Sequence, residues 1–167
     1  ALVMADVAGK GVPAALLVSS FHAYLSAYLE SRVTLVDLAK RLNTVIYRAS
    51  TEERYITAIL ALFNPATGEL ESINAGHTPM YLLRKEGTFV ELGRGGLALG
   101  MMDMDFPYET DSVVLERGDR LLLFTDGVSE AMNAAGNLYD TDGALRDLVV
   151  RHRPDRDGGG RRSATGL

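Results

Sequence analysis

The amino-acid sequence predicts an α+β fold in which helices pack on antiparallel sheets. After a short first strand, the residues up to about 50 have hydrophobic patterns typical of helices, and the residues that follow have the pattern of strands. Short turn segments join the predicted strands, as they do in antiparallel hairpins. With 167 residues and a hydrophobic fraction of 47%, the chain can bury one core. The resulting order is a strand, two helices, several strands and a last helix.

One strand and two helices are predicted before the period changes. Residues 1–5 are all apolar, which is typical of a strand covered on both faces. Residues 14–29 follow a proline suited to a first helical turn and are apolar almost all round, which indicates a helix buried against a sheet. Thr34 and Asp37 have the spacing of a capping box and predict the start of a second helix. Its apolar stripe consists of Leu35, Leu38, Leu42, Val45 and Ile46.

The middle of the chain is predicted to form strands. Two hairpins turn at residues 64–68 and 85–87, where Asn, Pro, Gly and charged residues gather. Residues 93–100 are rich in Gly and are expected to form a connection. The predicted strands span residues 55–63, 69–75, 80–84, 88–92, 108–115 and 120–124.

The end of the chain is predicted to hold one more helix and a tail. The helix is expected over residues 142–151, with Leu145, Leu148 and Val149 facing inward. Residues 154–167 are rich in Asp, Arg and Gly and are predicted to be disordered. We therefore expect one incomplete domain over residues 1–153 and a tail beyond it.

Composition excludes several functional classes. The chain has no cysteine, which excludes disulfides, thiolate zinc sites and cysteine nucleophiles. Its net charge of −5 does not favour a nucleic-acid partner. The longest apolar run, residues 12–29, is interrupted by Ser and His, so no membrane span is predicted and a cytoplasmic location is expected. Because the chain starts with Ala1 inside a predicted strand, we expect further sequence upstream.

Two aspartates follow matching apolar strands. Asp6 ends one strand and Asp126 follows another, and each is next to a Gly-containing turn. A buried carboxylate is costly unless something compensates it, and Mg²⁺ or Mn²⁺ does so well because both prefer carboxylate oxygens. The alternative is that each aspartate caps a turn. The matched pair leaves both interpretations open.

Four other polar residues are candidates for the same region. Asn74 and His77 lie in a tight turn after a strand, where His77 could be an acid, a ligand or, as we favour, a hydrogen-bond partner of the turn. Thr57 is interpreted as an ordinary strand residue. Glu130 would share a helix face with Asp126 and act as a neighbouring or solvated carboxylate.

Two further interpretations concern a lysine and a histidine. The segment around Lys10 has the Gly residues of a phosphate-binding loop but lacks the Walker spacing, so a nucleotide switch is the weaker alternative. His22 lies within the apolar helix and is expected to be a core residue.

Taken together, the motifs resemble the SpoIIE/RsbU-type branch of the PPM metal-dependent phosphatases. The first segment, DVAGKGVPAAL at residues 6–16, differs from the usual family motif mainly by Ala8 in place of Ser. The other matching segments are residues 55–58, 65–70, 73–79, 97–100, 118–121 and 125–131, in the family's order. The resemblance thus covers residues 1 to about 140.

The resemblance implies an α-β-β-α sandwich with a metal centre between two sheets. Two Mn²⁺ or Mg²⁺ ions would activate a water that attacks the phosphorus of a phospho-Ser or phospho-Thr. By motif position, Asp6 would bridge the metals, the Val7 carbonyl and Asp126 would also be ligands, and Gly127 would let the backbone pass close. Asp6 and Asp126 are thus the implied catalytic residues. The implied substrate is a phosphorylated STAS-type anti-sigma-factor antagonist, and an upstream sensor domain would regulate the enzyme.

The sequence departs from the family at two metal-binding motifs. An upstream GGDxxD-like strand and a late DDxT-like strand each carry a further aspartate in the family, and neither motif is present here. We therefore expect the domain to be cut short at both ends, with unpaired strand edges that could form a homodimer. The alternative is a non-catalytic pseudo-phosphatase that only binds a partner.

Overall fold

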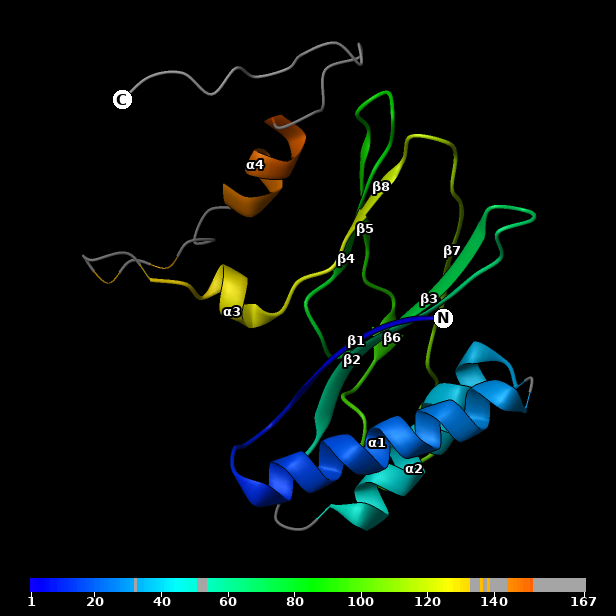
Figure 1. Ribbon diagram of the computed structural model, residues 1–167, viewed down its shortest axis with the longest axis vertical. Helices are drawn as coiled ribbons and strands as arrows, with labels where there is room; N and C mark the ends of the chain where they lie inside the picture. The colour runs from blue at the N-terminus through cyan, green and yellow to red at the C-terminus, as the bar shows by residue number, and fades with distance from the viewer. Residues whose placement is uncertain (32, 51–53, 133–135, 137, 139–143, 152–167) are drawn as a thin grey trace, which may run out of the picture.

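The computed structural model describes residues 1–31, 33–50, 54–132, 136, 138 and 144–151. Two mostly antiparallel sheets face one another in this part of the chain, with β3 and β6 as a parallel pair (Figure 1). The larger sheet has the order β1-β2-β3-β6, with β7 also pairing with β3, and the smaller has the order β5-β4-β8. The larger sheet consists of β1 (Leu2–Val7), β2 (Ile56–Phe63), β3 (Glu69–Ala75), β6 (Gly95–Gly96) and β7 (Asp111–Val114). The smaller consists of β4 (Met80–Leu83), β5 (Phe89–Leu92) and β8 (Arg120–Leu122).

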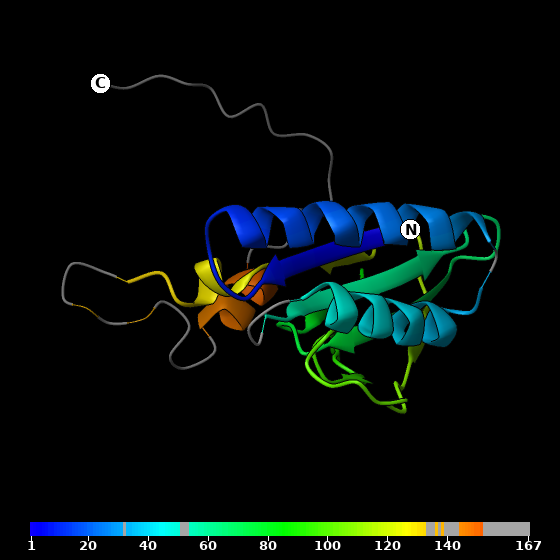
Figure 2. The ribbon, with the colours of Figure 1, turned by 90° about the horizontal axis from the view of Figure 1, so that it is seen from below.

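Helices cover the outer face of each sheet. The two long helices, α1 (Val12–Glu30) and α2 (Leu35–Ala49), lie on the larger sheet, as the turned view shows (Figure 2). On the smaller sheet, α4 (Ala144–Arg151) places the Arg146 guanidinium 4.9 Å from the centre of the Phe89 ring. The predicted α-β-β-α arrangement is therefore confirmed.

Two hydrophobic cores correspond to the spaces between these layers. The core under the long helices joins residues such as Leu42, Ile46 and Leu60, each fully buried. The core between the sheets joins Ile59 of β2 to Leu82 of β4. Successive residues of β2 thus point to opposite cores, as the two-residue period of a strand requires.

The second helix is as the sequence predicts. The Thr34 hydroxyl accepts a hydrogen bond from the Asp37 backbone N–H at 3.1 Å, which satisfies one of the free donors at the helix start. The buried face of α2 includes Leu35, Leu38, Ala39, Leu42, Asn43 and Ile46. Four of the five residues named in its predicted stripe are buried and fix its orientation on the sheet, namely Leu35, Leu38, Leu42 and Ile46, whereas Val45 is half-buried.

The predictions of complete burial for α1 and β1 are wrong. Only one face of α1 is buried, through Ala14, Leu17, Phe21 and Leu25, while Leu16 is 64% exposed. In β1, Leu2 is 42% exposed, and within the described chain this strand lies at the edge of the larger sheet. An apolar run cannot show which of its faces a neighbour covers.

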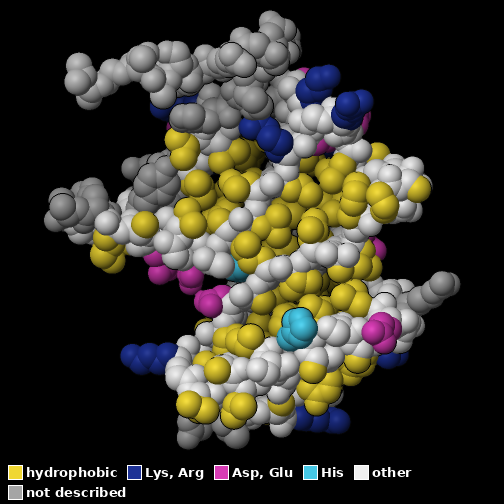
Figure 3. Space-filling view, viewed as in Figure 1, with side chains coloured by type: hydrophobic (Ala, Val, Ile, Leu, Met, Phe, Trp, Pro, Cys, Tyr) yellow, Lys and Arg dark blue, Asp and Glu magenta, His cyan; other side chains and the backbone are white. Residues whose placement is uncertain are grey.

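Exposed apolar side chains also form a broad field on one face of the molecule. Figure 3 shows them over the smaller sheet and between that sheet and α1. By length and composition alone, α1 could cross a membrane, although core helices pass the same test. In the structure, one face of α1 packs into the core that α2 and the larger sheet also form.

Smaller differences concern the ends of elements. The strand predicted over residues 108–115 is confined to β7, and the Gly-rich connection contains β6. In α4, Leu145 is buried but Leu148 is 41% exposed. His22, expected in the core, is exposed. The predicted tail, residues 154–167, and the domain boundary at residue 153 lie outside the described residues.

Candidate functional site

The candidate site lies where β1, β3 and β8 end at the same edge of the sandwich. In the register of the larger sheet, Asp6 is opposite Thr57, and Met4 is opposite Ile59. Ile59 belongs to the core between the sheets, so Asp6, two residues after Met4, points to the side of the smaller sheet. The Thr57 hydroxyl donates a long hydrogen bond of 3.5 Å to the backbone carbonyl of Asp6. Thr57 therefore supports the strand end.

The turn from β3 to β4 carries the motif residues Asn74 and His77. The Asn74 side chain accepts a hydrogen bond from the His77 N–H at 2.7 Å and donates one to the His77 carbonyl at 2.8 Å. Gly76 has a φ of 69°, and a Cβ there would lie 3.0 Å from the Ala98 backbone nitrogen. A residue with a side chain is thus strained at this position. These contacts fix the turn that carries His77 between the sheets.

The strand end that leads to Asp126 is tied to the same turn. The Thr78 hydroxyl donates a hydrogen bond to the Phe124 carbonyl. Two residues later, Asp126 begins the short helix α3 (Asp126–Ser129), and its carbonyl accepts from the Glu130 N–H at 2.7 Å. The predicted helix start is confirmed, and Thr78 is a positioning residue that sequence reasoning missed. In the sequence, the only indication of this role was that Thr78 follows His77 directly.

Asp6 and Asp126 both influence the ionisation of the His77 imidazole. Burial lowers this pKa below its ordinary value of 6.5, while the negative charges of Asp6 and Asp126 act in the opposite direction. Burial prevails, so the ring is favoured in its neutral form. Two aspartates 120 positions apart in sequence therefore lie within electrostatic reach of one histidine.

The residues at this edge fit a divalent cation in part. His77 Nε2 is buried, and among the described residues it has no hydrogen-bond partner. Together with two nearby carboxylates, it indicates a polar site that the described side chains do not fill. In the described part of the chain, however, no group of three or more acidic, His or Cys side chains is close enough to hold a metal. The described side chains at this edge therefore offer two carboxylates near one imidazole, which is less than a metal-binding group of three.

The burial expected of the two aspartates is not observed. Asp6 and Asp126 are both exposed, so no desolvation cost requires a cation. Turn capping is not supported either, because the helix that starts at Asp126 has no side-chain cap. The metal-ligand assignment of both aspartates stays a prediction.

The structure gives the positions of the remaining candidate residues, but their contacts do not assign them a role. Val7 ends β1, next to Asp6, as its predicted ligand role requires. A Cβ on Gly127 would meet only the Thr125 hydroxyl, at 3.6 Å, so packing alone does not require glycine there. Glu130 is exposed at the end of α3, and Lys10 is exposed beyond β1.

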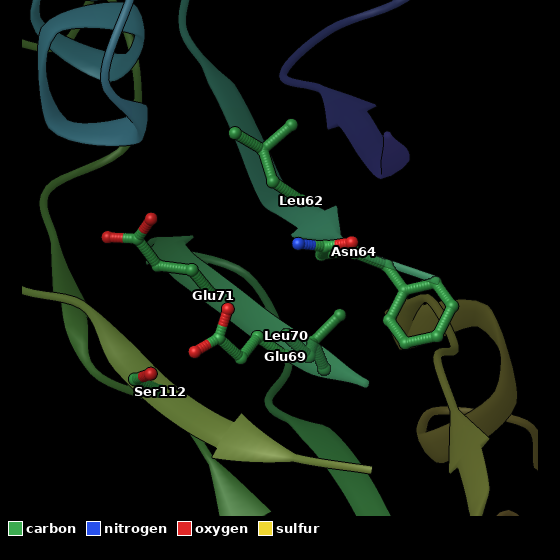
Figure 4. Close-up of a pocket in the computed structure, with 7 residues that line it drawn as sticks. Leu62, Asn64, Glu69, Leu70, Glu71 and Ser112 are labelled. Atoms are coloured by element: carbon green, nitrogen blue, oxygen red, sulfur yellow. The ribbon is translucent and has the colours of Figure 1, made fainter. Parts of the chain in front are cut away.

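A hollow of about 290 Å³ lies at the opposite end of the larger sheet (Figure 4). Glu69 and Glu71 of β3, Ser112 of β7 and Leu62 of β2 line it. None of the predicted site residues is among its lining residues. The hollow is therefore separate from the edge that carries Asp6 and Asp126.

Comparison with known proteins agrees with the fold and the motifs. The SpoIIE family, described as stage II sporulation protein E, matches residues 1–158. Phosphoserine phosphatase RsbU of Bacillus subtilis is 34% identical over 152 residues, which is 90% of this chain and 44% of RsbU. The chain thus spans less than half the length of this relative.

Solved structures of similar fold include phosphatase domains. The RsbU and RsbW domains of a Mycobacterium tuberculosis protein have a TM-score of 0.75, 24% identity, and cover 89% of this chain and 41% of theirs. The PP2C phosphatase domain of SpoIIE from Bacillus subtilis has a TM-score of 0.65 and 24% identity, over 81% of this chain and 40% of that one. RsbX, solved with magnesium, has a TM-score of 0.62 and 18% identity, over 75% and 59% of the two chains. By its match over residues 1–158 and its identity to RsbU, the chain belongs to the SpoIIE family, whose fold is that of the PP2C-type phosphatases.

Proposed function

We propose that this chain is part of a metal-dependent phosphatase domain that hydrolyses phospho-Ser or phospho-Thr in a protein. The observation that carries the proposal is the convergence of Asp6 and Asp126 on His77 at one edge of the sandwich. Membership in the SpoIIE family and similarity to a named phosphoserine phosphatase support it. A magnesium complex of the neighbour RsbX supports Mn²⁺ or Mg²⁺ as the metal.

The residues of this chain would hold and orient the reacting groups. Asp6, the Val7 carbonyl and Asp126 would bind the two expected cations, and Asn74 would fix the backbone around His77. When bound, such cations lower the pKa of water and neutralise charge on phosphoryl oxygens. Because both aspartates are exposed, a phosphorylated protein side chain can approach them directly.

The family resemblance supports a specific substrate class and setting. The substrate would be a phosphorylated STAS-type anti-sigma-factor antagonist in the cytoplasm, and an upstream sensor domain would control its dephosphorylation. The RsbU and RsbW domains of the similar structure point to partner-switching signalling of this kind. Because β1 is the outermost strand of the larger sheet among the described residues, two copies of the chain would form a homodimer by pairing through this strand.

One observation favours a second function, that of a pseudo-phosphatase. The described residues hold only part of a metal-binding set, because no three suitable side chains come together there. A domain with this site could bind the phosphorylated partner and leave the phosphate in place. The two functions differ in phosphate release but not in binding.

The test is phosphate release from a phosphorylated STAS protein, measured with this chain and with a version extended at both ends. The proposal predicts release that needs Mn²⁺ or Mg²⁺ and stops in EDTA, at least for the extended domain. Asp6→Asn and Asp126→Asn should each stop it. Full activity in EDTA would contradict the metal mechanism, whereas tight binding without release in both versions would establish the pseudo-phosphatase.

A further inference from the structure

The segment after β6 presents three neighbouring methionines to solvent. Met101, Met102 and Met104 are 45%, 50% and 50% exposed, whereas Met80 is fully buried. Single exposed apolar residues are ordinary, but a group of them marks an interaction surface. The thioether side chain is flexible and polarisable, which suits it to adaptable binding surfaces.

Tyr47 of α2 extends this group. Its side chain is 43% exposed, and a Cβ on Gly100, immediately before the methionines, would lie 3.2 Å from the Tyr47 backbone nitrogen. The backbone of Tyr47 therefore lies beside the start of the methionine segment. We call Tyr47, Met101, Met102 and Met104 the methionine patch.

The backbone under the methionine patch is held by a buried side chain. Asn43 of α2 is 3% exposed, and its Nδ2 donates to the carbonyls of Met102 at 3.0 Å and Met104 at 3.3 Å. Its Oδ1 accepts from the Gly100 N–H at 2.9 Å. A buried amide thus uses both of its polar atoms to fix this one segment. The main chain is ordered before binding, which reduces the entropy that a partner must overcome.

Acidic residues alternate with the methionines. Asp103 and Asp105 are exposed; Asp105 forms an ion pair with the Lys40 ammonium at 2.7 Å, which balances part of its charge, so Asp103 contributes most of the negative charge of this border. The chain as a whole is also acidic, with a net charge of −5. An apolar patch with an acidic border is complementary to an apolar surface with basic residues beside it.

We propose that the methionine patch docks an amphipathic helix of a partner protein, with the apolar stripe of that helix on the methionines and its basic flank beside Asp103 and Asp105. Flexible methionine surfaces characteristically receive amphipathic helices. The patch lies with α2 on the helix side of the larger sheet, whereas Asp6 faces the smaller sheet. The interaction is thus independent of phosphate hydrolysis at the candidate site.

The experiment uses the whole chain with ¹³C-labelled methionine methyl groups, of which it has six. The probe is a synthetic 14-residue helix of Leu and Lys with Leu on one face. The proposal predicts that the methyl signals of Met101, Met102 and Met104 shift in a saturable way, whereas the buried Met80 and the 70% exposed Met132 do not. A matched Leu and Glu helix should bind at least about tenfold more weakly because of the acidic border.

Two variants keep the test specific. Replacing Met101, Met102 and Met104 together with Gln keeps the length and flexibility of the side chains but makes them polar, and should weaken binding of the Leu and Lys helix by at least about tenfold. Replacing Asp103 and Asp105 with Asn should weaken it less and remove its salt dependence. Equal shifts at Met132, equal binding of the Leu and Glu helix, or unchanged binding by the Gln variant would each overturn the proposal. Shifts produced by zwitterionic lipid vesicles but not by the helix would overturn it in favour of a membrane contact.

Discussion

On the helix side of the larger sheet, Leu42 and Ile46 are completely buried, whereas Asp6 and Asp126 at the edge of the sandwich are exposed. The first region is stabilised by packing that this chain supplies by itself. The second consists of strand ends held by backbone and turn contacts. Stability and chemistry therefore reside in different residues, and substitutions should separate the two.

The largest effect is expected from the carboxylates at the site. Asp6→Asn or Asp126→Asn should reduce phosphate release by the extended domain about 100-fold or more, because each removes the charge of a proposed metal ligand. Both positions are exposed, so the melting temperature should barely change. Phosphate release and thermal unfolding measured on the same samples check this. Activity and melting temperature falling together would mean that the site also maintains the fold.

The converse substitution is Leu42→Ala in the core under the helices. Leu42 is fully buried, so the cavity should lower the free energy of unfolding by about 2–5 kcal/mol. Urea unfolding measures this change. The matched control is Leu16→Ala on α1, whose side chain is 64% exposed and should matter much less. If Leu42→Ala and Leu16→Ala lowered the free energy of unfolding by similar amounts, this would contradict the burial of Leu42 and the exposure of Leu16.

A smaller and pH-dependent effect is expected at the turn before β8. Asp119, whose side chain is 3% exposed, accepts hydrogen bonds from the Glu116 and Lys85 N–H groups and from the Arg84 guanidinium. Burial raises the pKa of Asp119, but these hydrogen bonds and the charge of Arg84 outweigh it and hold the pKa below its ordinary value of 3.8. A carboxyl with a depressed pKa stabilises the fold above that ordinary value, and its contribution is lost as the pH falls through the lowered pKa.

Asp119→Asn should therefore cost about 1–3 kcal/mol at pH 7, since charge-assisted hydrogen bonds are lost. The difference from the parent chain should shrink as the pH falls below 3.8, where the parent carboxyl becomes protonated. Urea unfolding at pH 7 and at low pH measures it. A difference that stayed constant with pH would show that the charge of Asp119 is not what stabilises this turn.

The smallest effect concerns the pKa of His77. Asp6 and Asp126 both raise this pKa against the effect of burial, so Asp6→Asn or Asp126→Asn should each lower it further. NMR titration of the ring signals measures the change, with the exposed His22 as an internal reference. An unchanged His77 titration in both variants would mean that the carboxylates do not lie close to the ring.

The sequence predicted most of the fold because its strands and α2 have clear periods. Thr34 and Asp37 marked the start of α2, and Asn64 to Gly68 marked a hairpin, since both signals are local. The exposure of Leu16 and Leu2 could not be predicted, because it depends on which face of α1 the larger sheet covers and on the position of β1 at the end of the strand order. Asp6, His77 and Asp126 were identified by their motifs. Their proximity to one another, and the role of Thr78, depend on how two sheets meet in space.

The proposed function requires Asp6 and Asp126 to share one divalent-cation site beside His77. The most direct measurement is the NMR signal of the His77 ring in this chain during titration with Mn²⁺, whose paramagnetism broadens nearby nuclei. We expect the His77 signal to broaden at low Mn²⁺, more strongly than that of His22, and we expect excess Mg²⁺ to reverse the broadening and Asp6→Asn and Asp126→Asn to abolish it. A His77 signal that stays sharp, or that broadens equally in both variants, would contradict it.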